Sequence, residues 1–231
     1  MERADTRNAL SQTPSGLITI PRELGTDRAL ALLADGRTAG LLVDAAAIKC
    51  GETVLVEAAA GGVGSLLVQL AHRAGGWVVA AAGGERNADV ARALGADLVM
   101  DYSQPDWARR LRSELNGRGV DVVFDGVGGD IGRAAFELVA RGGRFCAFGM
   151  ASGRFTDFLE NEIAERDVTA IRGVHASCDA LRQAAQTAVE LACEGCLRPL
   201  IGQMFPLAEA AEAHAASEAR ATIGKTLLQV A

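Results

Sequence analysis

The chain has 231 residues, of which 49% are hydrophobic and 23% charged, and its formal net charge is −6. This is the composition of a globular protein with a substantial core. A nucleic-acid binder is not expected, because no basic run is present. A membrane span is not expected either, because it needs about 18 uninterrupted apolar residues. The polar segment 1–14 lacks the apolar stretch of a secretory signal and the five cysteines show no disulfide-like arrangement, so we expect a cytoplasmic protein.

The first predicted element is a short isolated strand at 16–20, which ends at Pro21. From Val54 onward, short apolar runs alternate with amphipathic stretches. We predict strands at 54–56, 77–80, 97–100, 120–124 and 144–148, with a candidate sixth at 168–171. The helices predicted between them are 63–74, 86–94, 105–115 and 131–139, and Pro105 suits the first turn of the third.

These strands are continuously apolar, so both of their faces should be covered by helices. Their alternation with helices predicts an α/β fold, a doubly wound parallel Rossmann sheet, over residues 36–176. The remaining segments, 1–35 and 177–231, do not continue the alternation and are interpreted as parts of a second unit. The latter segment predicts a helix to about Cys193, a strand at 203–205, a helix at 207–219 and a strand at 226–230.

The first strand runs into a glycine-rich turn and then directly into a helix. This pattern is a dinucleotide-binding fingerprint with Ala59, Gly61 and Gly64 in its three glycine positions, and Gly62 and Val63 between the last two. Gly61 lets the backbone approach a pyrophosphate, Gly64 lets the helix pack on the strand, and the free N–H groups at the helix start attract the anion. A turn that serves helix packing alone is the alternative.

The end of the second strand bears on the choice of cofactor. An NAD site usually carries an acidic residue there to hold the ribose hydroxyls, whereas this strand ends in small residues that include Gly83. They leave room for a 2′-phosphate, and Arg86 follows to pair with it, although Glu85 stands beside it. Arg86 as a solvated residue of the helix start is the competing interpretation. We therefore predict NADPH as the cofactor, with NADH as the alternative.

At these residues the chain resembles the medium-chain dehydrogenase/reductase superfamily, in its zinc-free quinone oxidoreductase and enoyl reductase branch. The resemblance extends from about Gly16 to the end of the chain and is most specific between Gly51 and Gly153. The matching stretches are 51–56, 59–64, 93–97, Asp101-Tyr102, 125–129, 142–144, Phe148-Gly149, Ser152-Gly153, Thr38-Ala39 and Gly224-Lys225.

The resemblance implies a role for several residues. Tyr102 should lie along the adenosine phosphate side of the cofactor. Val127, Phe148 and Gly149 should approach the nicotinamide half, and Thr38 should lie near the nicotinamide or its ribose. These five positions are expectations of the family pattern.

Two departures from the family pattern matter for function. Arg220 matches a C-terminal arginine that binds the 2′-phosphate in some relatives, but Asn87 stands where the family often has a lysine for that phosphate. Family members also begin with a GroES-like catalytic domain of about a hundred residues. The chain resembles a member that lacks most of that domain, with remnants of it at both ends.

Other kinds of site have little support in the sequence. Cys193 and Cys196 are spaced as a metal-binding pair, but no second pair accompanies them, so we interpret them as helix-end and core residues and predict no metal. His72 and His214 are expected on helix surfaces, and Asp125 as a structural residue near the cofactor crevice. No pattern typical of a hydrolase is present.

The predicted function is hydride transfer from NADPH to a small-molecule substrate, a quinone or an activated double bond. No catalytic residue is identified, because quinone reduction can take its proton from water. The alternative is a cofactor-binding remnant with little or no turnover. As a partner we expect a second copy of the chain, paired through an edge strand within 168–174, from Val168 to Val174.

Overall fold

A computed structural model describes residues 6–10, 17–173 and 176–230, without the side chains of residues 6–10 and Leu17. The described chain divides into two compact units. Unit 1 comprises the residues up to Leu41, Gly61–Leu66, and the residues from Ala176 onward. Unit 2 comprises Leu42–Ala60 and the described residues from Leu67 to Gly173.

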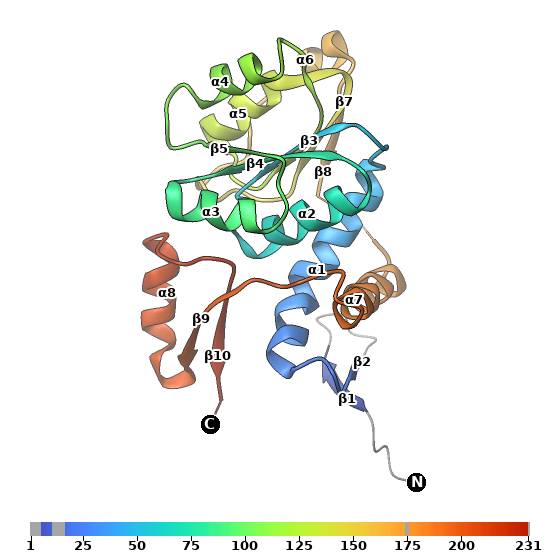
Figure 1. Ribbon diagram of the computed structural model, residues 1–231, viewed down its shortest axis with the longest axis vertical. Coiled ribbons are helices and arrows are strands. Elements are labelled where there is room, and N and C mark those ends of the chain that lie inside the picture. The colour runs from blue at the N-terminus through green and yellow to red at the C-terminus, as the bar shows by residue number, and fades with distance from the viewer. Residues whose placement is uncertain (1–5, 11–16, 174–175, 231) are drawn as a thin grey trace. The chain divides into compact units, whose positions relative to one another are not determined.

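Unit 2 is built on a six-stranded parallel sheet, as the sequence predicts (Figure 1). The sheet order is β5-β4-β3-β6-β7-β8, which is the doubly wound order of dinucleotide-binding folds. The order reverses between β3 and β6, and ligands of such sheets bind outside the carboxyl ends of the strands at this point. The strands are β3 (Thr53–Glu57), β4 (Trp77–Ala82), β5 (Leu98–Asp101), β6 (Val120–Asp125), β7 (Val139–Ala147) and β8 (Thr169–Arg172).

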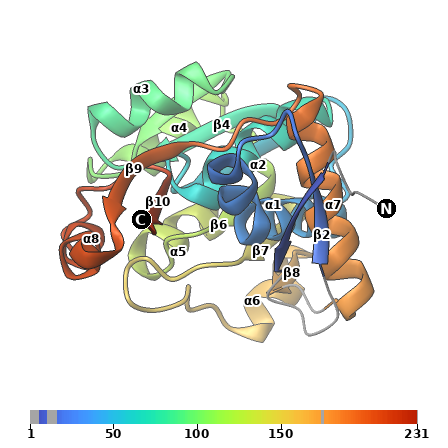
Figure 2. The ribbon, with the colours of Figure 1, turned by 90° about the horizontal axis from the view of Figure 1, so that it is seen from below.

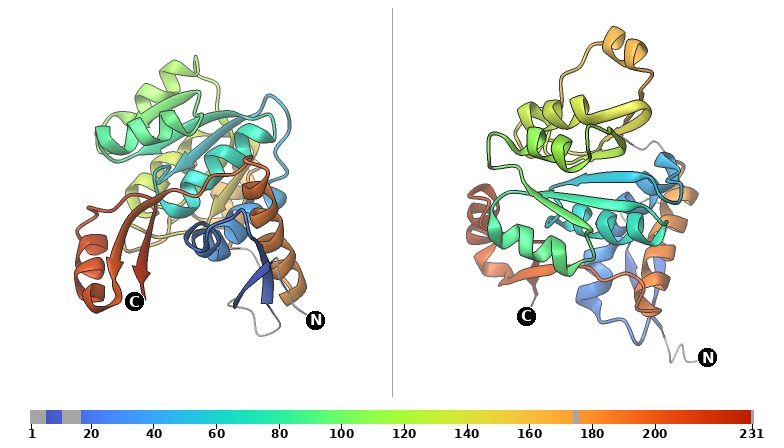
Figure 3. Two further views of the ribbon diagram at one scale, coloured as in Figure 1. Left: turned by 60° about the horizontal axis from the view of Figure 1, so that its bottom comes forward. Right: turned by 45° about the horizontal axis from the view of Figure 1, so that its top comes forward.

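Helices cover both faces of this sheet, because its strands are apolar on both sides (Figures 1 and 3). On one face lie α4 (Trp107–Glu114) and α5 (Gly129–Leu138). On the other lie α3 (Glu85–Ala93) and the later turns of α2 (Gly62–Arg73). The short helix α6 (Glu160–Arg166) packs against β7.

The core of unit 2 includes three phenylalanine rings in mutual contact. Phe136 of α5 stacks on Phe158 with 4.9 Å between ring centroids. Phe145 of β7 meets both rings edge-on at 5.5 and 5.6 Å. Aromatic contacts of this kind add to the stabilisation from burial, so they fix the segment that carries Phe158 against the sheet.

Element boundaries differ from the sequence predictions in small ways. Helix α4 begins at Trp107 with Asp106 as its N-cap, so Pro105 precedes the helix and does not lie in its first turn. Strand β7 begins at Val139, well before the predicted start, because Val139 pairs with Val120 ahead of a shift in register. Helix α6 was not predicted from the sequence.

Unit 1 contains elements from both ends of the chain. Strand β1 (Thr6–Leu10) pairs antiparallel with β2 (Leu17–Pro21), so the strand predicted as isolated has a partner. Strand β2 contacts α7 (Cys178–Cys193), whose position was predicted (Figure 2). Strands β9 (Ile201–Pro206) and β10 (Lys225–Gln229) pair in parallel, with α8 (Ala210–Glu218) beside them (Figure 3).

The 21-residue helix α1 (Thr26–Ala46) was not predicted, because Gly36 and Gly40 interrupt its pattern. The structure gives a reason for Gly36, since a methyl group there would lie 2.8 Å from the Cβ of Ala188 in α7. Gly36 therefore lets two helices of unit 1 approach closely, at a cost in helix propensity of about 1 kcal/mol. None of the helices in the described residues has the length and apolar character that a membrane crossing requires.

Candidate functional site

The fingerprint turn has the local geometry that the sequence predicts. Ala58 adopts a left-handed conformation with φ 48°, and the N–H of Ala59 donates to the carbonyl of Ala81 on β4 at 3.1 Å. The N–H groups in the first turn of a helix have no acceptor within the helix. Those of Val63 and Gly64 donate to none of the described residues. The start of α2 thus presents backbone donors that suit an anion.

A carboxylate that the sequence analysis did not identify lies at this helix start in unit 1. A methyl group on Gly62 would collide with the carboxylate of Asp35 in α1. Asp35 in turn pairs with the ammonium of Lys225, with 3.0 Å between Oδ1 and Nζ. Gly62 therefore permits a close approach of Asp35 to the backbone, and Lys225 offsets the negative charge of Asp35. The bridge between Gly61 and Gly224 brings the C-terminal strand to the same turn.

At the end of β4 in unit 2, the structure brings Gly83 and Tyr102 together. A methyl group on Gly83 would lie 2.9 Å from the Tyr102 ring, and the N–H of Tyr102 donates to the carbonyl of Ala82 at 3.1 Å. Asp101 fixes this turn, since its Oδ1 accepts from the N–H of Gly84 at 2.9 Å and from the hydroxyl of Ser103 at 2.6 Å. Partial burial opposes ionisation of Asp101, but these hydrogen bonds outweigh it and lower its pKa.

The residues that bear on the 2′-phosphate lie at the start of α3. Glu85 and Arg86 are the first two residues of the helix and both are exposed. The amide of Asn87 donates to the carbonyl of Gly83 at 2.8 Å, so this residue fixes the turn and supplies no positive charge. No described carboxylate pairs with the guanidinium of Arg86.

Strand β6 ends in Asp125, a completely buried residue whose carboxylate fixes the next turn. Its Oδ1 accepts from the N–H groups of Val127 at 3.0 Å and Gly128 at 2.7 Å. Its Oδ2 accepts from the hydroxyl of Thr156 at 2.5 Å. Through these three hydrogen bonds Asp125 holds two separate segments at the switch point of the sheet.

A second buried carboxyl group, that of Glu57 at the end of β3, lies beside Asp125. Burial, and then the hydrogen bond and repulsion from Asp125, raise the pKa of Glu57 well above its ordinary value. Its Oε2 accepts from the N–H of Val127 at 3.4 Å, while Oε1 accepts from none of the described residues. A protonated Glu57 can donate to Asp125, whereas two carboxylates would repel each other. Glu57 therefore retains a proton at pH values where exposed glutamates have lost theirs.

The turns after β6 and β7 pack backbone against backbone. The N–H groups of Phe148 and Gly149 donate to the carbonyl of Asp125 at 2.9 and 3.2 Å. A methyl group on Gly149 would lie 2.6 Å from the carbonyl oxygen of Gly126. The structure thus brings together Val127, Phe148 and Gly149, which the resemblance assigned to one end of the cofactor.

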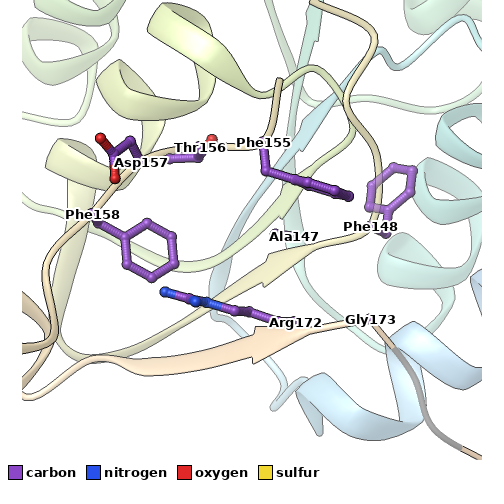
Figure 4. Close-up of a pocket in the computed structure, with 8 residues that line it drawn as sticks. All are labelled: Ala147, Phe148, Phe155, Thr156, Asp157, Phe158, Arg172 and Gly173. Carbon is purple, nitrogen blue, oxygen red and sulfur yellow. The ribbon is translucent and has the colours of Figure 1, made fainter. Parts of the chain in front are cut away.

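A pocket opens beside these turns, at the carboxyl ends of β7 and β8 (Figure 4). Its volume is about 460 Å³, within the range of small-molecule sites. Three phenylalanine side chains and one guanidinium group contribute to its wall. The lining residues are Ala147, Phe148, Phe155, Thr156, Asp157, Phe158, Arg172 and Gly173.

Two predicted site residues lie in unit 1. Thr38 is in the middle of α1, and its hydroxyl donates to the carbonyl of Ala34 at 2.8 Å. Arg220 follows α8 in a left-handed conformation with φ 55° and is exposed. Their proximity to the cofactor stays a prediction.

The cysteines and histidines have no common site among the described residues. Cys193 ends α7, as expected, but both it and Cys196 are exposed, so the interpretation of these cysteines as core residues was wrong for this pair. His72 and His214 are exposed on helices, as expected. The described residues contain no group of three or more His, Cys, Asp or Glu side chains placed to hold a metal.

Comparison with known proteins identifies the family. The family described as zinc-binding dehydrogenase matches residues 94–228. A quinone oxidoreductase of Pseudomonas aeruginosa is 33% identical over 92% of this chain and 67% of its own length. A 2-haloacrylate reductase of a Burkholderia species is 30% identical over 92% of this chain. The chain spans 66% of the length of that reductase.

Solved structures agree with this assignment. The quinone oxidoreductase of Escherichia coli, solved in complex with NADPH, has a TM-score of 0.84 at 29% identity and matches 92% of this chain and 68% of its own. An NAD-dependent alcohol dehydrogenase also has a TM-score of 0.84, at 33% identity, and matches 94% of this chain and 63% of its own. The chain belongs to the medium-chain dehydrogenase/reductase superfamily, in its zinc-free quinone oxidoreductase branch.

Proposed function

We propose that the protein transfers hydride from NADPH to a quinone or an activated carbon–carbon double bond. The observation that carries this proposal is the switch point of the sheet, where Asp125 ties Val127, Phe148 and Gly149 into one backbone surface. Similarity to quinone oxidoreductases and to a 2-haloacrylate reductase supports the reaction class. The chain spans about two thirds of the length of these relatives. The activity of the whole protein is therefore part of the proposal.

Each unit, taken by itself, offers groups that suit part of a nicotinamide dinucleotide. In unit 1 the donors of Val63 and Gly64 suit the pyrophosphate. In unit 2 the close approach of Gly83 to the Tyr102 ring supplies a surface for the adenosine end. When bound, the cofactor supplies a hydride from C4 of its nicotinamide ring. The surface formed by Val127, Phe148 and Gly149 orients that ring and excludes water from one side of it.

The preference for NADPH rests on charge. Strand β4 ends at Ala82 and Gly83 follows it, so the strand end itself carries no acidic residue of the kind that holds the ribose hydroxyls in NAD sites. Arg86 is an exposed cation that suits a 2′-phosphate, and Arg220 of unit 1 is the second cation predicted for that role. A close structural neighbour binds NADPH, although another equally similar one is NAD-dependent. Asn87 lowers the positive charge at this site relative to the family pattern.

Reduction of a quinone to a hydroquinone consumes one hydride and one proton. The hydride carries both electrons, and water supplies the proton. No described side chain is assigned as a proton donor. Steady-state loss of NADPH absorbance with p-benzoquinone as acceptor tests the proposal. We expect turnover that exceeds the uncatalysed rate, and a reduced rate with NADH. Binding of NADPH without any acceptor-dependent oxidation would favour the alternative, a cofactor-binding protein without turnover.

We further propose that two copies of the chain associate through β8. This strand is at the edge of the sheet and pairs with β7 alone among the described strands. Its other edge offers backbone groups to a second copy, and closed two-fold pairing is the commonest oligomeric arrangement. Light scattering at micromolar concentration should give the mass of a dimer, and the mass of a monomer would overturn the proposal. The expected contribution of Val174 lies outside the described residues.

A further inference from the structure

Two buried carboxyl groups lie side by side at the switch point of the sheet, without a cation. Glu57 ends β3 and Asp125 ends β6, and these two strands are neighbours within the sheet (Figure 1). Both side chains are completely buried. None of the ion pairs among the described residues includes either of them. Negative charge that is buried without a counterion is destabilising, so a cation brought by a ligand would stabilise this cluster.

The elements packed around the pair add no further charge to it. Ala81 of β4 is the pairing partner of Glu57 in the sheet. Next to Asp125 lie Gly132 of α5 and Thr156 of the segment that follows β7. The charged residues of α5 form ion pairs elsewhere, Asp130 with Arg154, and Arg133 with Glu137 and Glu162. The charge that acts on Glu57 is therefore that of Asp125.

The pair retains a single proton, which resides on Glu57. Three donors, from Val127, Gly128 and Thr156, converge on Asp125 and favour its ionised form. Glu57 accepts one bond of 3.4 Å from the N–H of Val127, and its Oε1 accepts from none of the described residues. Burial and the neighbouring Asp125 raise the pKa of Glu57. The pair thus carries one negative charge, and it carries two once Glu57 ionises.

This charge lies next to the backbone surface that the proposed function assigns to the nicotinamide ring. The N–H of Val127 is 3.0 Å from Oδ1 of Asp125 and 3.4 Å from Oε2 of Glu57. The carbonyl of Asp125 accepts from the N–H groups of Phe148 and Gly149. The reduced ring is neutral, whereas the oxidised ring carries one positive charge. Because charges attract more strongly in a protein interior than in water, the pair favours the oxidised ring.

We propose that Glu57 and Asp125 act as the counterion of the oxidised nicotinamide ring, and that Glu57 loses its proton when NADP⁺ binds but keeps it when NADPH binds. The proton passes to the solvent, and no covalent bond of the cofactor changes in this equilibrium. Ionisation of Glu57 then strengthens NADP⁺ binding by the same factor by which NADP⁺ favours ionisation. A site that favours the oxidised form makes bound NADPH a stronger hydride donor. The inference rests on the proposed function in one respect, the position of the ring against Val127.

Titration calorimetry with NADP⁺ and with NADPH, on the full chain at several pH values above the ordinary glutamate pKa, tests this proposal. We expect the affinity for NADP⁺ to rise relative to that for NADPH as the pH rises, by at most about tenfold per pH unit because one proton is linked. The ratio of the two affinities cancels the titration of the 2′-phosphate, which both forms carry. Repetition in buffers of different ionisation enthalpy should show that NADP⁺ releases more protons than NADPH.

The Glu57→Gln variant keeps the shape of the protonated side chain and cannot ionise. It should bind both forms of the cofactor with a ratio of affinities that does not change with pH, and the excess release of protons should be lost. Glu114→Gln alters an exposed glutamate of α4 and should keep both effects. A merely structural role of Glu57 would change both affinities by the same factor at every pH.

The possible failures are distinguishable. A ratio of affinities that stays constant with pH in the unaltered protein would overturn this inference and leave the proposed function intact. An unchanged pH dependence in a folded Glu57→Gln variant would overturn the assignment of the linked proton to Glu57. An absence of binding of both forms would overturn the proposed function, and this inference with it.

Discussion

Two turns at the carboxyl edge of one sheet are each fixed by an aspartate carboxylate that accepts backbone N–H groups, but the two carboxylates have different surroundings. Asp101 ends β5 and accepts from the N–H of Gly84, and Asp125 ends β6 and accepts from the N–H groups of Val127 and Gly128. Asp101 is partly exposed, whereas Asp125 is completely buried beside a second carboxyl, that of Glu57. The first arrangement favours an ionised carboxylate, and the second adds a carboxyl that favours its protonated form.

The largest expected effect comes from removal of Asp125. The Asp125→Ala variant leaves the buried donors of Val127, Gly128 and Thr156 without their acceptor, so we expect a loss of about 3 kcal/mol in the free energy of unfolding. Urea denaturation at neutral pH measures it. The Asp125→Asn variant keeps a carbonyl oxygen for the two N–H groups and should lose about 1–2 kcal/mol. Equal, small losses in both variants would show that Asp125 does not hold the turn.

The next effect concerns the pH dependence contributed by Glu57. Its pKa is raised in the folded state, so its contribution to stability is complete below the ordinary glutamate pKa and is lost as the pH rises toward the folded value. We expect the free energy of unfolding to fall by at most about 1.4 kcal/mol per pH unit in this interval. Glu57→Gln, which resembles the protonated form, should flatten this slope.

Urea denaturation of both proteins at several pH values above the ordinary glutamate pKa measures this slope. Glu114→Gln alters an exposed glutamate of α4 and serves as a matched control with no effect on the slope. The assignment of a retained proton to Glu57 is contradicted if Glu57→Gln and the unaltered protein show parallel profiles.

The smallest effect is expected at Asp101, with the opposite sign. Its pKa is lowered in the folded state, so its stabilisation is present above the ordinary aspartate pKa and is lost as the pH falls toward the lowered value. Because solvent screens this partly exposed group, Asp101→Asn should cost less than about 1 kcal/mol at neutral pH. The difference between variant and unaltered protein should shrink on acidification. A difference that grows on acidification would contradict the assigned state of Asp101.

The sheet was predicted well from the sequence because each strand is a short apolar run between amphipathic helices. This alternation can be read from neighbouring residues alone. The small residues at the end of β4, where other sites carry an acid, were also readable from the sequence. Helix α1 was not predicted because Gly36 disfavours a helix locally. The reason for a glycine at this position is a tertiary one, the close approach of Ala188. Helix propensity includes the destabilisation caused by such a glycine, but not the tertiary contact that offsets it.

The pairing of Glu57 with Asp125 was not predicted, because it joins two strands that are distant in sequence. A signal did exist, since Glu57 is a charged residue at the end of a strand that is otherwise apolar. The approach of Asp35 to Gly62 was missed for the same reason, because α1 itself was not foreseen. The pocket at Arg172 depends on where the segment with Phe155 and Phe158 folds, which no local pattern specifies.

The central claim is that the protein binds NADPH, and thermal unfolding tests it most directly. The protein is heated alone, with NADPH and with NADH, together with the Arg86→Ala, Arg220→Ala and control Arg109→Ala variants. At about one hundred times its Kd a ligand adds roughly 2.7 kcal/mol of stability. We expect a larger rise in Tm with NADPH than with NADH, reduced in the first two variants and kept in the control. An absence of any rise with either nucleotide would contradict the account.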